Sequence, residues 1–145
     1  MGAEAVLLPN VENRDMVLAA VAVLDRVGGL TDLPIWCMME TPMAMLHAEE
    51  IAFAHARVGC LVIGTSGLAK DLHAAHTPAR TPFMTSLALC ILAARAAGIG
   101  TLDGVHLELA DGDGLRASFV QGLEVGMDGK TLVHTKTIAT TNEGF

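Results

Sequence analysis

Five times along this chain of 145 residues, a short apolar run is followed by a segment with helical spacing. The apolar runs lie at residues 5–8, 33–40, 60–63, 100–105 and 131–133. Continuous apolar runs are typical of strands buried on both faces, and strands that alternate with helices form parallel sheets with right-handed crossovers. The sequence therefore predicts one α/β domain over residues 1–145, with five parallel β/α units.

Capping residues and glycines mark the ends of the predicted helices. Side chains that can cap a helix N-terminus are found at Asn13, Thr81 and Asp113. Pro82 suits the first turn of the helix that begins at Thr81. Glycines that can end a helix are Gly28-Gly29, Gly98 and Gly126. Further helical segments are expected at residues 44–56, 68–72 and 136–145.

The composition argues against several classes of protein. Hydrophobic residues make up 52% of the chain, yet no apolar run approaches the roughly 18 residues that a membrane span needs. The first residues lack the basic segment of a signal peptide, so the cytoplasm is the expected location. A net charge of -7 argues against nucleic acids and anionic membranes as partners. The cysteines are widely spaced among apolar residues and are expected to be reduced core thiols: Cys37, Cys60 and Cys90.

Polar and small residues follow each predicted strand. In chain order they are Asn10 and Glu12, Glu40 and Thr41, Thr65, Ser66 and Gly67, Asp103 and Gly104, and His134 and Thr135. Parallel β/α folds bind ligands and metals at this edge of the sheet. A single residue of this kind is more often a cap or a turn residue, whereas the whole set favours a functional site.

Five segments carry a resemblance to a known family: VLLPNVE, IWCMMETP, LVIGTSGLAKDL, LDGVHLEL and GMDGKTLVHTKTI. In order and spacing they resemble strand ends of the HpcH/HpaI aldolase and citrate lyase β-subunit superfamily, in its acyl-CoA ester lyase branch. This branch includes malyl-CoA, citramalyl-CoA and citryl-CoA lyases. The resemblance implies a TIM-type barrel, a homo-oligomer or association with another subunit, and Mg²⁺ as cofactor. It also implies a CoA thioester of a hydroxy acid and a 2-oxo acid as ligands, with cleavage or formation of the carbon–carbon bond between the oxo acid unit and the carbon next to the thioester.

The resemblance also implies roles for individual residues. Glu40 matches the first Mg²⁺ ligand of the family, whereas the position of the second ligand, an Asp in the family, is Gly67. Asp71 does not obviously replace that ligand. No catalytic residue is assigned. The substrate-binding residues expected at the strand ends are Thr41, Thr65, Ser66 and Asp103, and structural roles are expected for Glu12 and His134. Asp103 before Gly104 equally fits a turn-stabilising residue.

Three interpretations remain open. In the family, the first strand of this chain corresponds to the fourth strand of the barrel, and a barrel normally needs about 250 residues. The chain is therefore expected to be the C-terminal part of a lyase barrel, five of eight units, with a defective metal site. Alternatively, it is a non-catalytic half-barrel that associates with itself or with a full-length paralogue. A flavodoxin-like or CheY-like module fits the length, but the sequence lacks a glycine-rich phosphate loop and an acidic cluster after the first strand.

Overall fold

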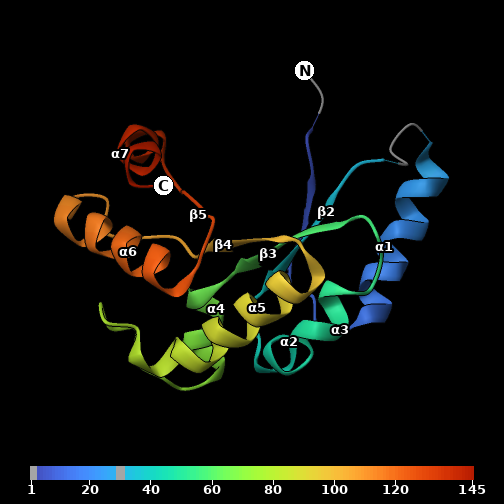
Figure 1. The fold of residues 1–145 in the computed structure, drawn as a ribbon, viewed down its shortest axis with the longest axis horizontal. Helices are drawn as coiled ribbons and strands as arrows, with labels where there is room; N and C mark the ends of the chain where they lie inside the picture. Colours follow the sequence, from blue (N-terminus) through green and yellow to red (C-terminus); the bar gives the residue numbers. More distant parts are fainter. Residues whose placement is uncertain (1–2, 29–31) are drawn as a thin grey trace.

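The computed structural model describes residues 3–28 and 32–145; Gly29, expected at the end of the first helix, lies outside the described residues. Five parallel strands form one sheet in the order β1-β2-β3-β4-β5 (Figure 1). Their bounds are β1 Val6–Leu8, β2 Ile35–Met39, β3 Val58–Ile63, β4 Gly100–Asp103 and β5 Gly129–Lys130.

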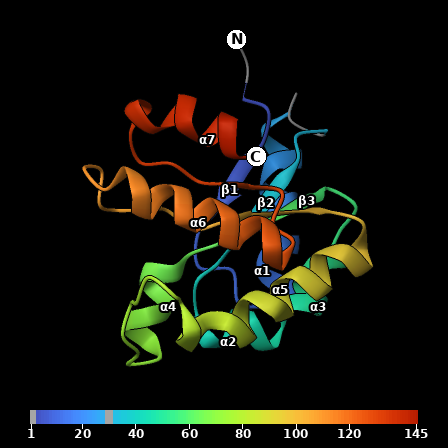
Figure 2. The ribbon, with the colours of Figure 1, turned by 60° about the vertical axis from the view of Figure 1, so that its left-hand side comes forward.

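The strand order distinguishes between the two predicted architectures. Each strand pairs with the next one along the chain, so the order never reverses as it does in a doubly wound sheet. Right-handed crossovers between successive neighbours place the connecting helices on one face of the sheet. The helices α1, α2, α3 and α5 indeed lie together on one side of it (Figures 1 and 2). The flavodoxin-like and CheY-like alternatives are therefore wrong, and the order is that of consecutive units of a barrel.

Seven α-helices and two short 3-10 helices lie between and after the strands in the described residues. They are α1 Arg14–Val27, α2 Pro42–Leu46, α3 Ala48–Ala52, α4 Thr65–Asp71, η1 Thr81–Phe83, α5 Met84–Ala97, α6 Gly112–Val125, η2 Thr135–Thr137 and α7 Ile138–Gly144. The core lies between the sheet and these helices, with Ile35, Cys37 and Met39 of β2 fully buried. All three cysteines are buried and free, as predicted. Among the residues that the structure describes, no helix combines the length and apolarity needed to cross a membrane.

Several predicted helix ends are confirmed. The side chain of Asn13 caps α1 by accepting a hydrogen bond from the backbone N–H of Met16 at 3.1 Å. Gly98 and Gly126 follow α5 and α6 with φ of 69° and 100°, a left-handed conformation that glycine adopts without strain. These signals are local, which is why the sequence alone locates them.

Two predicted caps are wrong. Thr81 begins the 3-10 helix η1, so the N-cap position there is Arg80, whose φ is 53°. Asp111, rather than Asp113, caps α6, because its Oδ1 accepts the backbone N–H of Gly114 at 2.8 Å. Both Asp residues precede a glycine and are good capping residues, so the sequence pattern did not separate them.

Other predicted boundaries also differ; the helix expected at residues 68–72, for example, begins earlier, at Thr65. The fifth strand lies at Gly129–Lys130 instead of residues 131–133, because it pairs with the short strand β4, which ends at Asp103 rather than residue 105. The expected helix over residues 44–56 is divided into α2 and α3 at His47. The ring nitrogen Nδ1 of His47 lies 2.8 Å from the carbonyl oxygen of Glu12, which ties this break to the segment after β1.

Candidate functional site

Glu40 follows the last residue of β2 at the carboxyl edge of the sheet. Its Oε1 accepts a hydrogen bond of 2.9 Å from the backbone N–H of Asn10, which follows β1. Asn10 has a φ of 50°, a conformation that asparagine tolerates better than most residues. Thr41 then caps α2 through its Oγ1, which accepts the N–H of Ala44 at 3.1 Å. The neighbouring strand and the helix start therefore fix the Glu40 backbone and one of its carboxylate oxygens.

Two glycines from the segment after β3 pack against Glu40. A Cβ atom on Gly64 would overlap the Glu40 Cβ, so only glycine fits there without a shift. A Cβ atom on Gly67 would lie 3.3 Å from Glu40 Oε2 and 3.2 Å from the Glu40 carbonyl oxygen. A side chain at position 67 would therefore start beside the Glu40 carboxylate. The structure brings together the two positions that the resemblance pairs as metal ligands.

The residues around Glu40 fit a magnesium ion incompletely. Mg²⁺ prefers about six oxygen ligands in octahedral geometry and is commonly held by one or two carboxylates with water and substrate oxygens. Glu40 supplies one carboxylate, and Gly67 supplies none. Within residues 3–28 and 32–145, no group of three or more His, Cys, Asp or Glu residues is arranged to hold a metal. Glu40 alone would therefore hold magnesium weakly.

The other predicted site residues are distributed along the edge. Thr65 is buried, while Ser66 is exposed on the first turn of α4. The backbone carbonyl of Glu12 contacts His47, and His134 caps η2 by accepting the N–H of Lys136 at its Nδ1, 3.1 Å away. The substrate-binding roles of Thr41, Thr65 and Ser66 stay predictions.

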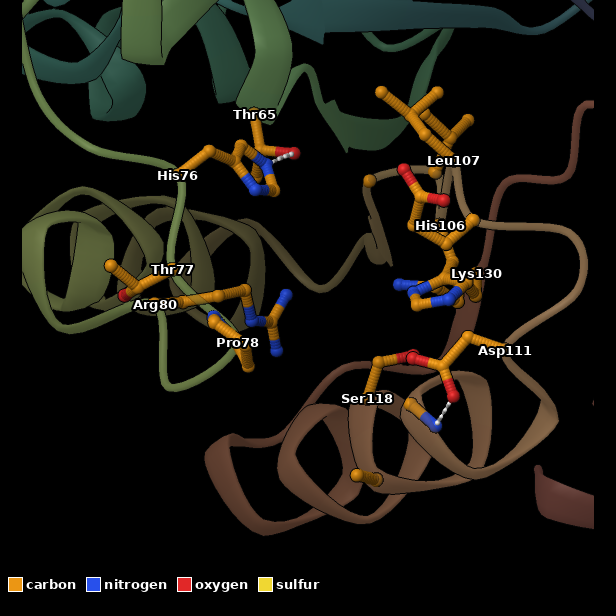
Figure 3. Close-up of a pocket in the computed structure, with 15 residues that line it drawn as sticks. Thr65, His76, Thr77, Pro78, Arg80, His106, Leu107, Asp111, Ser118 and Lys130 are labelled. Carbon is orange, nitrogen blue, oxygen red and sulfur yellow. Dashed lines mark hydrogen bonds between the residues drawn. The ribbon is translucent and has the colours of Figure 1, made fainter.

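A cavity of about 400 Å³ lies beside Thr65 (Figure 3). It is bordered by the segment between α4 and η1, the segment between β4 and α6, and α6 itself. Its lining residues include Thr65, His76, Arg80, His106, Ser118 and Lys130. His76 is exposed, and its Nε2 lies 3.2 Å from Thr65 Oγ1, so this histidine borders the cavity wall. Arg80 reaches into the cavity from one side, and His106 and Lys130 lie on the other.

A buried cluster of three charged residues lies at this cavity, which two of its members, Arg80 and Lys130, line. Asp103 is fully buried; its Oδ1 pairs with Arg80 Nη1 at 2.5 Å and its Oδ2 with Lys130 Nζ at 2.8 Å. The side chains of Arg80 and Lys130 are only 7% and 2% exposed. Burial lowers the pKa of Lys130 from its ordinary value, and the charge of Asp103 opposes this shift.

The contacts of Asp103 indicate a structural role for its carboxylate in this structure. Both carboxylate oxygens accept a hydrogen bond from a cation, and Oδ1 also accepts the N–H of Gly104 at 2.8 Å. The geometry gives Asp103 the role of holding two cations, and its contact with substrate stays a prediction. Arg80 and Lys130 were not candidate residues in the sequence. Arg80 lies outside the five segments that carry the resemblance, and Lys130 lies in GMDGKTLVHTKTI without an assigned role; only the fold brings both to one carboxylate.

Comparison with known proteins shows the family of this chain. The family model for HpcH/HpaI aldolase/citrate lyase matches residues 1–135. The chain belongs to this family. It is 46% identical over 143 residues to a (3S)-malyl-CoA thioesterase of Cereibacter sphaeroides, a match that covers 99% of this chain and 48% of that protein. An L-malyl-CoA/β-methylmalyl-CoA lyase of the same species is 27% identical over 145 residues, covering 88% of this chain and 46% of the lyase.

A solved family structure confirms the fold. The citrate lyase β subunit of M. tuberculosis, complexed with oxaloacetate and magnesium, superposes with a TM-score of 0.74 at 23% identity. The superposition covers 97% of this chain and 60% of that one. The predicted resemblance and the predicted partial TIM-type barrel are therefore both confirmed. The chain spans about half the length of the curated relatives. Its correspondence to the C-terminal part of the barrel stays a prediction.

Proposed function

We propose that this chain forms part of a site that acts on a CoA thioester of a hydroxy acid, of the malyl-CoA type. The observation that carries this proposal is the 46% identity to a (3S)-malyl-CoA thioesterase across 99% of the chain. The position of Glu40 at the carboxyl edge supports it, because β/α barrels bind their substrates at this edge. Because the chain spans 48% of that relative, the complete activity is part of the proposal.

Thioester hydrolysis is the first candidate reaction. In it, water attacks the thioester carbonyl, the carbon–sulfur bond breaks, and the products are free CoA and the hydroxy acid. The higher identity to the thioesterase, 46% against 27% for the lyase, favours this reaction. Carbon–carbon cleavage is the second candidate, supported by the lyase relative and the family. It converts the hydroxyl carbon into the carbonyl of a 2-oxo acid and releases a shorter acyl-CoA.

Magnesium belongs to the proposal as a weakly held ion at Glu40. Support comes from the Glu40 carboxylate on a rigid strand end, with Oε2 toward Gly67, and from the magnesium complex of the citrate lyase β subunit. A bound Mg²⁺ would supply positive charge that stabilises an oxyanion. The protein's own contribution is positional, since the Asn10 N–H orients the Glu40 carboxylate, Thr41 follows Glu40 in the sequence, and Ser66 precedes Gly67.

A non-catalytic role is the alternative proposal. In this reading, the half-barrel associates with a second copy or with a full-length relative and has no turnover of its own. The missing carboxylate at Gly67 supports it, as does the half-exposed apolar face of the sheet opposite the helices, which carries Trp36 and Met38.

Product analysis separates these proposals. The 145-residue chain is incubated with (3S)-malyl-CoA and Mg²⁺, and the CoA species are separated by chromatography. Hydrolysis yields free CoA and malate, whereas carbon–carbon cleavage yields acetyl-CoA and glyoxylate. Glu40→Gln should lower either rate on the order of 100-fold, because it removes the carboxylate that would hold the Mg²⁺ whose charge stabilises an oxyanion.

The matched control is Glu49→Gln on the exposed start of α3, which should leave the rate unchanged. Equal losses in both variants would contradict the site at Glu40. A chain with no turnover, beside an active thioesterase as positive control, would contradict catalysis by this chain on its own and favour the non-catalytic proposal.

A further inference from the structure

Two buried nitrogen atoms at the cavity beside Thr65 lack a hydrogen-bond partner. They are Arg80 Nη2 and His106 Nε2, and among the described residues these are the buried side-chain polar atoms without a partner. Both residues line the cavity. Buried polar groups in proteins are nearly always hydrogen-bonded, and a guanidinium N–H left unpaired is especially costly. Two such atoms at one cavity lack the hydrogen-bond partners that buried polar groups normally have.

We propose that this cavity binds a small oxyanion, a carboxylate or phosphate group, through Arg80 Nη2 and His106 Nε2. Hydrogen bonds hold the Arg80 side chain in a fixed position. Its Nε donates to Gln121 Oε1 at 2.6 Å, and its Nη1 donates to Asp103 Oδ1. The Gln121 amide in turn donates to the carbonyl oxygen of Ala79 at 2.7 Å. The guanidinium plane is held through two of its nitrogens, which leaves Nη2 for a ligand in the geometry that suits an oxyanion.

The charge of the cluster also favours an anion. Asp103 is the single carboxylate between Arg80 and Lys130, so the three groups, all ionised, carry a formal charge of +1. A buried charge is normally compensated by a partner. A bound oxyanion would neutralise the cluster.

Two acidic residues at the cavity do not fill this role. Glu108 and Asp111 both line the cavity but are exposed, and Asp111 Oδ1 accepts the Gly114 N–H at the start of α6. Neither carboxylate is bonded to Arg80 Nη2 or His106 Nε2. Their negative charge would weaken the binding of an anion without blocking it. Removing one of these charges should therefore strengthen binding.

The proposed site is separate from the chemistry proposed at Glu40. Asp103 and Lys130 are paired in register, and a Cβ on Gly122 of α6 would lie 3.6 Å from Asp103 Oδ2. The cluster therefore lies beneath α6, on the helix-covered face of the sheet. Glu40 instead contacts Asn10, Gly64 and Gly67. Loss of function at one site should not abolish binding at the other.

Calorimetric titration of the 145-residue chain tests the proposal, with inorganic phosphate and malonate as separate probes in buffer of constant ionic strength. We expect one probe to bind at one site per chain with a dissociation constant on the order of 1 mM or lower. Tighter binding of phosphate would identify a phosphate-bearing ligand, and tighter binding of malonate would identify a carboxylate. Absence of binding by both probes would overturn the proposal.

Variants test whether the bound anion is at Arg80. Arg80→Lys retains a cation beside Asp103 but removes Nη2, and should weaken binding about tenfold. Ala117→Leu, on the exposed α6 surface that lines the cavity, should weaken binding by filling it without touching the charged cluster. Glu108→Gln should strengthen binding about twofold or more by removing a like charge.

Two controls complete the design. Arg116→Lys alters an exposed arginine of α6 that does not line the cavity, and Glu40→Gln alters the other candidate site. Both should bind the probe as the unaltered chain does. Equal weakening by Arg80→Lys and Arg116→Lys would show that the anion binds nonspecifically to surface charge and would overturn the proposal. Ala117→Leu keeps the test valid if Arg80→Lys fails to fold.

Discussion

Glu40 and Gly67 occupy the two expected ligand positions at the carboxyl edge of the sheet, and only Glu40 carries a carboxylate. The Cβ position of residue 67 lies 3.3 Å from Glu40 Oε2, so an aspartate there would place a second carboxylate beside the first. We predict that Gly67→Asp raises the affinity for Mg²⁺ about tenfold, because a hard cation gains a second oxygen ligand. Titration of Mg²⁺ by calorimetry measures the change.

The control for this prediction is Gly67→Ala. Alanine introduces the same tight Cβ contact with the Glu40 carbonyl oxygen, 3.2 Å away, but brings no ligand. It should leave the Mg²⁺ affinity unchanged or slightly lower. Without metal, Gly67→Asp should also be less stable than Gly67→Ala, because two carboxylates then repel each other. An unchanged Mg²⁺ titration for Gly67→Asp would contradict the placement of a metal at Glu40.

The three cysteines predict a stability change at alkaline pH. Burial raises the pKa of Cys37, Cys60 and Cys90 to about 12 each. Thiols with a raised folded-state pKa stabilise the fold below their unfolded pKa, and this contribution is lost as pH rises toward 12. The free energy of unfolding should therefore fall above about pH 9, by up to about 1.4 kcal/mol per pH unit for each cysteine. Lys130, whose pKa burial lowers, opposes part of this fall.

Urea unfolding at about pH 8 and about pH 10 measures this effect. Cys90→Ala removes one of the three thiols from the core between α5 and Met45. It should lower the stability at both pH values but make the difference between them smaller. An identical pH difference in the variant and in the unaltered chain would contradict the assignment of the alkaline loss to the thiols.

At the scale of the elements, the start of α6 gives a direct test of a corrected boundary. Asp111 caps this helix, whereas Asp113 lies in its first turn. We predict that Asp111→Ala lowers the free energy of unfolding by about 1 kcal/mol, the usual cost of losing an N-cap. Asp113→Ala should cost about 0.3 kcal/mol, because it loses only a favourable interaction with the helix dipole. Urea unfolding of both variants compares them, and equal costs would contradict the cap at Asp111.

The same elements show how far local sequence signals extend. The Asn13 cap and the ends of α5 and α6 at Gly98 and Gly126 depend on one turn of backbone, and the sequence predicts them correctly. The position of β5 depends instead on where the neighbouring β4 ends. The break between α2 and α3 coincides with a contact between His47 and Glu12, far apart in the sequence. Long-range contacts of this kind have no local signal.

For the whole molecule, the sequence predicts the architecture better than the candidate site. Five β/α repeats and right-handed crossovers lead directly to the sequential parallel sheet. The resemblance also pairs Glu40 with Gly67, which the structure brings together. The Arg80–Asp103–Lys130 cluster could not be foreseen in the same way. Its members come from a loop and two strands, and one buried carboxylate connects them only after the sheet has formed.

The face of the sheet opposite the helices predicts association of the whole chain. Along β2, Ile35, Cys37 and Met39 are buried while Trp36 and Met38 are half-exposed, and Leu7, paired with Trp36, is 40% exposed. In a closed barrel this face is packed, so here we predict that a second chain covers it, as apolar faces and free strand edges favour association.

Light scattering after size-exclusion chromatography should then give a mass above the 15.1 kDa of one chain. Leu7→Lys should shift this mass toward 15.1 kDa, because it places a charge in the apolar face and on an edge strand. Val23→Lys is the control, since Val23 is also an exposed apolar residue, 49% exposed, on the outer helix α1. A mass of one chain before any substitution would contradict association through this face. Equal shifts by both variants would show that added charge, rather than the sheet face, controls the association.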